Sequence, residues 1–122
     1  NIYQAQKALD NAKHAVKDGG IIILVASCKE GFENKTFENW MMTKTKEQMI
    51  KEIKDNFVLG GHKAAAVAMT LMKANIYMVT DYDKGIIEHI GFRYFNNLQE
   101  PFDRPYFGYW IKSVYAVNCI QH

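Results

Sequence analysis

Six consecutive apolar residues, 21–26, follow the glycine pair Gly19-Gly20 and constrain the fold more than any other feature of the chain. The run Ile-Ile-Ile-Leu-Val-Ala is too short for a typical helix and does not alternate between apolar and polar residues. This pattern is typical of a β-strand that is covered on both faces, as inner strands of parallel sheets are. We therefore predict a central parallel strand at residues 21–26.

Helical patterns surround this strand, and a second apolar run, 75–80, indicates a second buried strand. Before the first strand, Ala5, Ala8, Leu9, Ala12 and Val16 share one helical face, and Tyr3, Lys7, Asn11 and His14 share the opposite one. Further helices are predicted at 37–41, from a capping box at 45–48, at 62–73 and at 84–90. Alternating strands and helices predict an α/β fold, a layered α/β/α domain with a mainly parallel sheet.

The composition of the 122 residues fits one domain with one core, since 48% of them are hydrophobic. The net charge of +2 is spread over lysines along the whole chain, which does not indicate nucleic-acid binding. No apolar run reaches the roughly 20 residues of a membrane span, and no leader is visible, so we expect a cytoplasmic protein. Cys28 and Cys119 could pair, but free thiols fit this expectation better.

The chain opens directly on a helical pattern at residues 3–8, without an initiator Met. We therefore expect a domain cut from a longer protein, with the missing part on its N-terminal side.

Three segments are placed where ligands bind in open α/β sheets, beyond the strands and at helix N-termini. They are 27–29, 60–63 and 80–81. In the second, Gly60 and Gly61 would let a helix N-terminus approach an anion, and Lys63 would add charge. The alternative is a plain turn with a solvated lysine, because the segment has neither of the glycine motifs that specify nucleotides.

Lys7 and Gln4 are neighbours at i, i+3 on the first helix, and Tyr3 is one turn before Lys7. A cation, an amide and a phenol could therefore meet on one small anion, or simply form a solvated helix face. Cys28 could act as a nucleophile after the strand, but a small buried side chain is the simpler interpretation. The histidines and cysteines lack metal-ligand spacing, so no metal site is predicted.

Three blocks of the chain resemble the C-terminal domain of the nickel-dependent lactate racemase family, the 2-hydroxyacid racemases and epimerases that use a nickel-pincer nucleotide. The blocks are 1–8 (NIYQAQKA), 19–31, which contains GGIII and ASCKEG, and 57–64 (FVLGGHKA). They occur in the order of the family, and the resemblance spans residues 1–100.

The resemblance implies a two-domain enzyme with substrate and cofactor in the cleft between the domains. The N-terminal domain of the family supplies the catalytic histidine pair, the lysine that holds the cofactor and the nickel-binding histidine. This chain would supply the opposite wall. There Lys7 would hold the substrate carboxylate, Gln4 would be a neighbouring hydrogen-bonding group, and Tyr3 would shape the pocket. His62 matches a variable position that is a candidate for choosing the substrate.

By the same resemblance, racemisation proceeds by hydride transfer from the hydroxyl-bearing carbon to the pincer ring, and this wall positions the substrate. We expect isomerase activity only in a full-length protein, with no catalytic residue, no activity and no bound cofactor in this chain alone. The expected partners are the N-terminal catalytic domain and a small 2-hydroxyacid. The alternative function is a non-enzymatic anion-binding or scaffold domain that keeps the fold.

Residues 101–122 form an aromatic tail that departs from the family pattern after residues 1–100. A truncated or frame-shifted C-terminus would explain the departure. We predict a strand at 109–117, because its apolar side chains need burial. That strand would join the sheet of this domain or pair across a self-association interface in a homo-oligomer.

Overall fold

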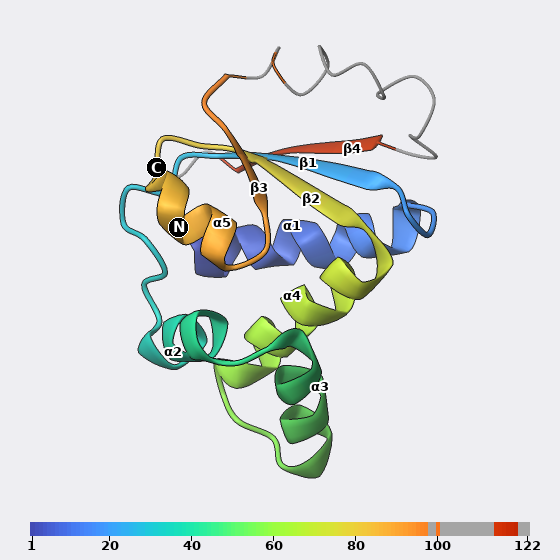
Figure 1. Cartoon of the computed structure of the whole chain (residues 1–122), viewed down its shortest axis with the longest axis vertical. Helices are drawn as coiled ribbons and strands as arrows, with labels where there is room; N and C mark the ends of the chain where they lie inside the picture. Colours follow the sequence, from blue (N-terminus) through green and yellow to red (C-terminus); the bar gives the residue numbers. More distant parts are fainter. Residues whose placement is uncertain (98–99, 101–113, 120–122) are drawn as a thin grey trace.

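The computed structural model describes residues 1–97, 100 and 114–119, and for Gln4 and 114–119 it describes the backbone only (Figure 1). The elements are α1 (Ile2–Ala15), β1 (Ile21–Ala26), α2 (Lys35–Thr43), α3 (Lys46–Asp55), α4 (Gly61–Lys73), β2 (Asn75–Val79), α5 (Lys84–His89), β3 (Arg93–Phe95) and β4 (Val114–Cys119). Among the described residues, no helix is long and apolar enough to span a membrane.

The four described strands form one sheet in the order β3-β2-β1-β4, and every neighbouring pair is parallel. Ile23 of β1 lies opposite Tyr77 of β2 on one side and opposite Ala116 of β4 on the other. This confirms the α/β class and the central position of the strand at 21–26. The short strand β3 was not predicted from the sequence.

The aromatic tail adds a strand, as predicted, and that strand pairs with β1 of the same chain. It begins at Val114 rather than at the predicted residue 109, and residues 109–113 lie outside the described part of the chain. Of the two predicted arrangements, the structure shows the one in which the strand joins the sheet of its own domain.

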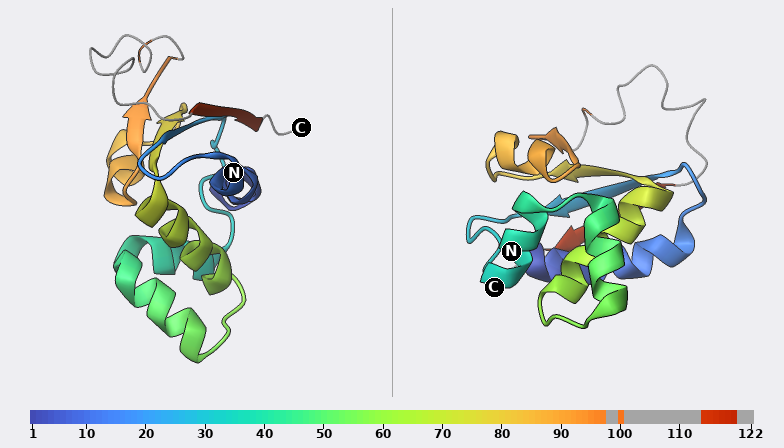
Figure 2. Two further views of the ribbon diagram at one scale, coloured as in Figure 1. Left: turned by 90° about the vertical axis from the view of Figure 1, so that its right-hand side faces the viewer. Right: turned by 60° about the horizontal axis from the view of Figure 1, so that its bottom comes forward.

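The two faces of the sheet carry different sets of buried side chains. Ile22, Leu24, Ile76 and Met78 belong to the large core that also contains residues of α1, α2, α4 and α5. Ile21, Ile23, Tyr77, Val79 and Phe95 form a separate cluster. Figure 2 shows α1 and α4 on the same side of the sheet. The helices therefore cover the first of these faces.

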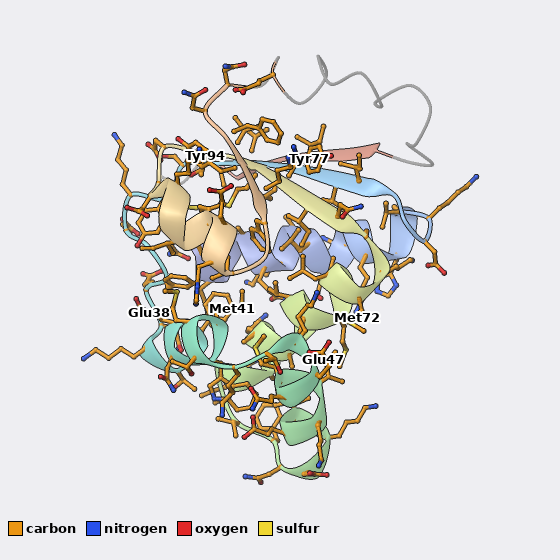
Figure 3. All side chains as sticks on the ribbon, in the orientation of Figure 1. Glu38, Met41, Glu47, Met72, Tyr77 and Tyr94 are labelled. Atoms are coloured by element: carbon orange, nitrogen blue, oxygen red, sulfur yellow. The ribbon has the colours of Figure 1, made fainter. Side chains whose placement is uncertain are left out.

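Local signals explain where α2 and α3 begin. The Asn34 side chain accepts a hydrogen bond from the backbone of Phe37 and caps α2. Thr45 and Gln48 form the predicted capping box at the start of α3. The buried face of α2 consists of Phe37, Trp40 and Met41, and Figure 3 shows Met41 directed from α2 toward the other helices.

The C-terminal ends of α1 and α4 are joined by hydrogen bonds. The Lys73 ammonium donates to the Lys13 carbonyl oxygen at 2.6 Å, and the Gly19 N–H donates to the Lys73 carbonyl oxygen at 2.8 Å. Both helices end near these contacts, and near their starts the Lys63 ammonium of α4 lies 6.0 Å from the centroid of the Tyr3 ring of α1. The alanine-rich sequence of α4 suits this close approach, since Ala64, Ala65 and Ala68 are all buried.

Candidate functional site

The first turn of α1 is fastened to the loop that follows β1. The Ile2 N–H donates to the Gly31 carbonyl oxygen at 2.9 Å, and the Asn1 side chain donates to the Glu33 carboxylate. Since this loop leaves the carboxyl end of β1, the N-terminus of α1 lies at the edge of the sheet where ligands of α/β proteins bind.

Tyr3 packs against its surroundings more than the helical pattern predicted. Its ring makes an edge-on contact with Phe37 at a centroid distance of 5.4 Å, and the Lys63 ammonium lies 6.0 Å from the Tyr3 ring centroid. This corrects the prediction of a polar face that includes Tyr3, which is half-buried. Tyr3, predicted for the substrate site, and Lys63, predicted for a separate anion site, are therefore brought together from different helices.

The structure says less about the other two predicted residues of α1, Lys7 and Gln4. Lys7 is exposed one turn after Tyr3, so its ammonium is available to an anion from solution. Gln4 belongs to α1, but its side chain lies outside the described part of the structure. Within the described part of the chain, His62 makes its hydrogen bond with Gly60 and its ring contact with Phe57, and neither interaction involves Lys7.

Packing explains both glycines at the start of α4. Gly60 adopts φ +87°, a conformation that favours glycine, and a Cβ on it would lie 2.7 Å from the Asn34 side-chain oxygen. A Cβ on Gly61 would lie 2.8 Å from the Trp40 ring. Two amides that could have faced an anion are already paired, because Gly60 N–H donates to His62 Nδ1 and His62 N–H donates to the Val58 carbonyl oxygen.

His62 is half-buried, and its ring is held at two points. Its Nδ1 atom accepts the hydrogen bond from Gly60 N–H at 3.0 Å, and the ring lies 5.1 Å from the ring of Phe57, measured between centroids. Phe57 and Leu59, in the same loop, are exposed large apolar residues. The first turn of α4 and the loop before it thus carry one imidazole and two exposed apolar side chains.

Asp81 links the carboxyl ends of β1 and β2. Its carboxylate accepts hydrogen bonds from the Ser27 hydroxyl at 3.1 Å and from the Cys28 N–H at 3.3 Å, and the Lys29 ammonium lies 4.0 Å away. The predicted segments 27–29 and 80–81 are therefore in direct contact. Sequence reasoning selected both segments but did not identify this pairing, which joins residues more than 50 positions apart.

An open cavity of about 470 Å³ adjoins this pair at the ends of β1, β2 and β3. Its polar lining includes Ser27, Thr80, Asp81 and Asn96, and Tyr94, labelled in Figure 3, contributes from β3. Asp81 already bonds to the neighbouring loop, so its main role is to hold that loop. The fully buried Cys28 fits the prediction of a small core side chain better than that of a nucleophile.

Tyr82 connects the loop after β2 to the loop that carries Gly31. Its hydroxyl lies close to Gly31, where an added Cβ would meet it at 2.8 Å. Burial raises the pKa of the Tyr82 phenol above its usual value of 10.0, and the nearby Glu38, Asp83 and Cys28 raise that pKa further. Asp81 and Tyr82 thus fix the loop that anchors the first turn of α1.

Residues 1–107 match the family model of the lactate racemase C-terminal domain. A curated lactate racemase from Thermoanaerobacterium thermosaccharolyticum is 31% identical over 86 residues, which cover 66% of this chain and 20% of that protein. The lactate racemase apoprotein structure from the same organism matches with a TM-score of 0.80 at 20% identity, covering 100% of this chain and 32% of the other.

The parallel sheet with helices packed on it defines this chain as an α/β domain. In this domain the first turns of two neighbouring helices, α1 and α4, meet at the Tyr3–Lys63 contact. Within that class, the chain belongs to the lactate racemase C-terminal domain family. It spans about one fifth of the length of the curated relative that it matches.

Proposed function

We propose that this domain forms the substrate-binding wall of a nickel-pincer-dependent 2-hydroxyacid racemase of the lactate type. In this wall, defined as Tyr3, Gln4, Lys7 and His62, the Lys7 ammonium holds the substrate carboxylate. Gln4 adds a hydrogen bond, Tyr3 closes one side, and His62 faces the remainder of the substrate. Family membership supports the proposal, because the matching family is named for lactate racemase.

The observation that carries the proposal is the contact between the Tyr3 ring and the Lys63 ammonium. It brings the first turns of α1 and α4 together, so that residues from two separate sequence blocks can share one ligand. Lys7 is exposed beside this contact and available for a charge-assisted hydrogen bond to a carboxylate. The edge-on packing of Tyr3 on Phe37 limits the movement of the wall before the substrate arrives.

The cofactor is assigned to another part of the whole protein. Within residues 1–97, 100 and 114–119, no group of three His, Cys, Asp or Glu side chains could hold a metal ion. The described residues therefore do not fit a nickel site, and we derive no chemical step from them. The contribution of this chain is to bind and orient the carboxylate, while a preceding catalytic domain, its proposed partner, performs the chemistry.

The proposal is tested by titrating this chain with lactate and following its amide NMR signals. We expect shifts concentrated in the first turns of α1 and α4. Lys7→Ala should weaken binding about 10- to 100-fold, since a hydrogen bond to a charged group contributes roughly 1.5–3 kcal/mol. Lys51→Ala, which removes an exposed lysine of α3, is the matched control and should leave binding unchanged.

The alternative, a scaffold or general anion-binding domain, makes a different prediction in the same titration. Such a domain would bind inorganic phosphate at least as well as lactate and would not depend on Lys7. Either result would contradict the proposal. The second part of the test is a chiral lactate assay of the whole gene product that contains this chain, prepared with its nickel cofactor.

A further inference from the structure

Two large apolar side chains are exposed in the loop between α3 and α4. Phe57 is 65% exposed and Leu59 is 71% exposed, and among the described residues Met72 is the other large apolar side chain that is strongly exposed. Figures 1 and 2 show this loop at the end of the helical layer that lies farthest from the sheet. A single exposed apolar side chain is normal on a protein surface, whereas neighbouring ones are typical of a contact site.

Hydrogen bonds hold this loop in a fixed shape. His62 N–H donates to the Val58 carbonyl oxygen at 2.9 Å, and Gly60 N–H donates to His62 Nδ1 at 3.0 Å. Val58, which lies between the two exposed residues in the sequence, packs against the large core. The loop is therefore anchored through Val58, and Phe57 and Leu59 are held in solvent instead of folding back onto the core.

The same loop lies close to the start of the chain. A Cβ on Gly60 would be 2.7 Å from the side-chain oxygen of Asn34. Glu33, the residue before Asn34, accepts a hydrogen bond from the side chain of Asn1. A polypeptide that precedes Asn1 therefore joins this chain near the loop.

We infer that Phe57 and Leu59 form a docking surface for an apolar patch of the catalytic domain that precedes this chain in the whole protein. This inference rests on the proposed function, which supplies that domain as the partner. The matching family is a C-terminal domain, and this chain covers 20% of the curated lactate racemase, so most of that relative lies outside the matched part. The partner patch is apolar because removing both side chains from water stabilises the contact.

Docking on this loop brings the partner to the proposed substrate-binding wall. The loop leads directly into α4, and the Lys63 ammonium in the first turn of α4 lies 6.0 Å from the centroid of the Tyr3 ring. A domain seated on Phe57 and Leu59 therefore lies beside the first turns of α1 and α4. The docking surface thus explains how catalytic groups on another domain would be brought to a substrate that this chain holds.

Cysteine labelling tests the docking surface without requiring activity. Leu59→Cys places a thiol in the loop, and Met72→Cys, the matched control, places one at the other end of α4. Both variants are prepared in this chain and in the whole gene product that contains it. Mass spectrometry of the peptide with the new cysteine follows its reaction with a maleimide.

We expect the two thiols to react at similar rates in the isolated chain, since both positions are exposed. In the whole gene product, the thiol at position 59 should react about tenfold more slowly, because labelling then requires the minor undocked state. The thiol at position 72 should keep its rate. An equal rate at position 59 in both proteins would overturn the docking surface and leave the lactate titration of Lys7 untouched.

A second copy of this chain is the competing occupant of the loop. It would slow the labelling at position 59 already in the isolated chain, and light scattering would then show a dimer that Leu59→Lys dissociates. That result would overturn docking of the catalytic domain.

Lactate racemisation by the whole gene product, prepared with its nickel cofactor, separates this inference from the proposed function. Leu59→Lys should lower the rate about tenfold, since an unpaired ammonium against an apolar patch opposes docking. Met72→Lys adds the same charge outside the surface and should leave the rate unchanged. An unchanged rate in Leu59→Lys would contradict the docking surface alone. If the unaltered gene product does not racemise lactate while labelling at position 59 is slowed, the proposed function is wrong and the docking surface stands.

Discussion

The ring of Trp40 lies against the backbone of Gly61 so closely that a Cβ on Gly61 would be 2.8 Å from two of its carbon atoms. This contact seats the first turn of α4 on α2. It explains the second glycine of the pair without any ligand, since only a residue without a side chain allows the indole to approach.

Gly61→Ala should therefore destabilise the domain by about 1–3 kcal/mol, the usual cost of overpacking a well-filled core. Chemical unfolding measures the loss. In a Trp40→Ala background the same substitution should cost much less, because the added methyl group then has room. An equal loss in both backgrounds would show that Trp40 is not the reason for the glycine.

The second prediction concerns Gln6, whose side chain is almost completely buried, with no hydrogen-bond partner for its nitrogen or its oxygen among the described residues. An unpaired buried polar group costs about 1–3 kcal/mol. Gln6→Leu, of similar size, should stabilise the chain by up to that amount in chemical unfolding. Gln6→Ala should stabilise less, since it leaves a cavity. A loss of stability in Gln6→Leu would contradict this account.

Features with a signal in neighbouring residues were predicted from the sequence, whereas features without such a signal were missed. The capping box at Thr45 and the apolar run of β1 were predicted correctly because each signal lies within a few neighbouring residues. The strand β3 has three residues, too few to show a period, and was missed. Burial of Gln6 was also missed, because a helical pattern marks a polar residue as exposed until its neighbours are known.

In the candidate site, too, the sequence indicated individual residues but not the contacts between them. The sequence indicated Tyr3 as part of a substrate site and Lys63 as part of a separate anion site, but only the folded chain shows their contact. The hydrogen bond between Gly60 and His62 depends on a positive φ at the glycine, which the sequence allows without specifying. Asp81 was recognised by its place after a strand, and its partners in the loop after β1 required the structure.

Tyr82 leads to a prediction about alkaline pH. Burial, and then Glu38, Asp83 and Cys28, raise the pKa of Tyr82 in the folded chain above the 10.0 of the unfolded chain. As the pH rises through 10.0, the unfolded chain loses this proton first, so stability falls in that range. Tyr82→Phe removes the titrating group, and its stability should decline less between pH 9 and pH 11. Urea unfolding across this range is the measurement, and parallel pH curves would contradict the raised pKa.

The assignment of the cofactor to another part of the protein predicts how this chain behaves alone. Purified without a metal-binding tag, it should contain no stoichiometric nickel and should not interconvert the enantiomers of lactate. Elemental analysis and a chiral lactate assay measure these two properties. Bound nickel in a one-to-one ratio, or measurable turnover, would require catalytic groups within these 122 residues and would contradict the assignment.

The last prediction concerns Asp81, because successive hydrogen bonds connect it through the loop after β1 to the first turn of α1. Its carboxylate holds the Ser27 hydroxyl and the Cys28 N–H, the Cys28 carbonyl oxygen accepts from the Gly31 N–H, and the Gly31 carbonyl oxygen accepts from the Ile2 N–H. Asp81→Ala should cost about 1 kcal/mol of stability, a modest value because this carboxylate is 43% exposed.

The more specific consequence of Asp81→Ala is local. Amide hydrogen exchange at Ile2 and Gly31 should become faster, because the loop that fastens the start of α1 has lost its anchor. Glu30→Ala, an exposed carboxylate in the same loop, is the matched control and should leave both amides unchanged. Equal effects of the two substitutions would mean that general loop charge, rather than the Asp81 hydrogen bonds, holds the first turn of α1 in place.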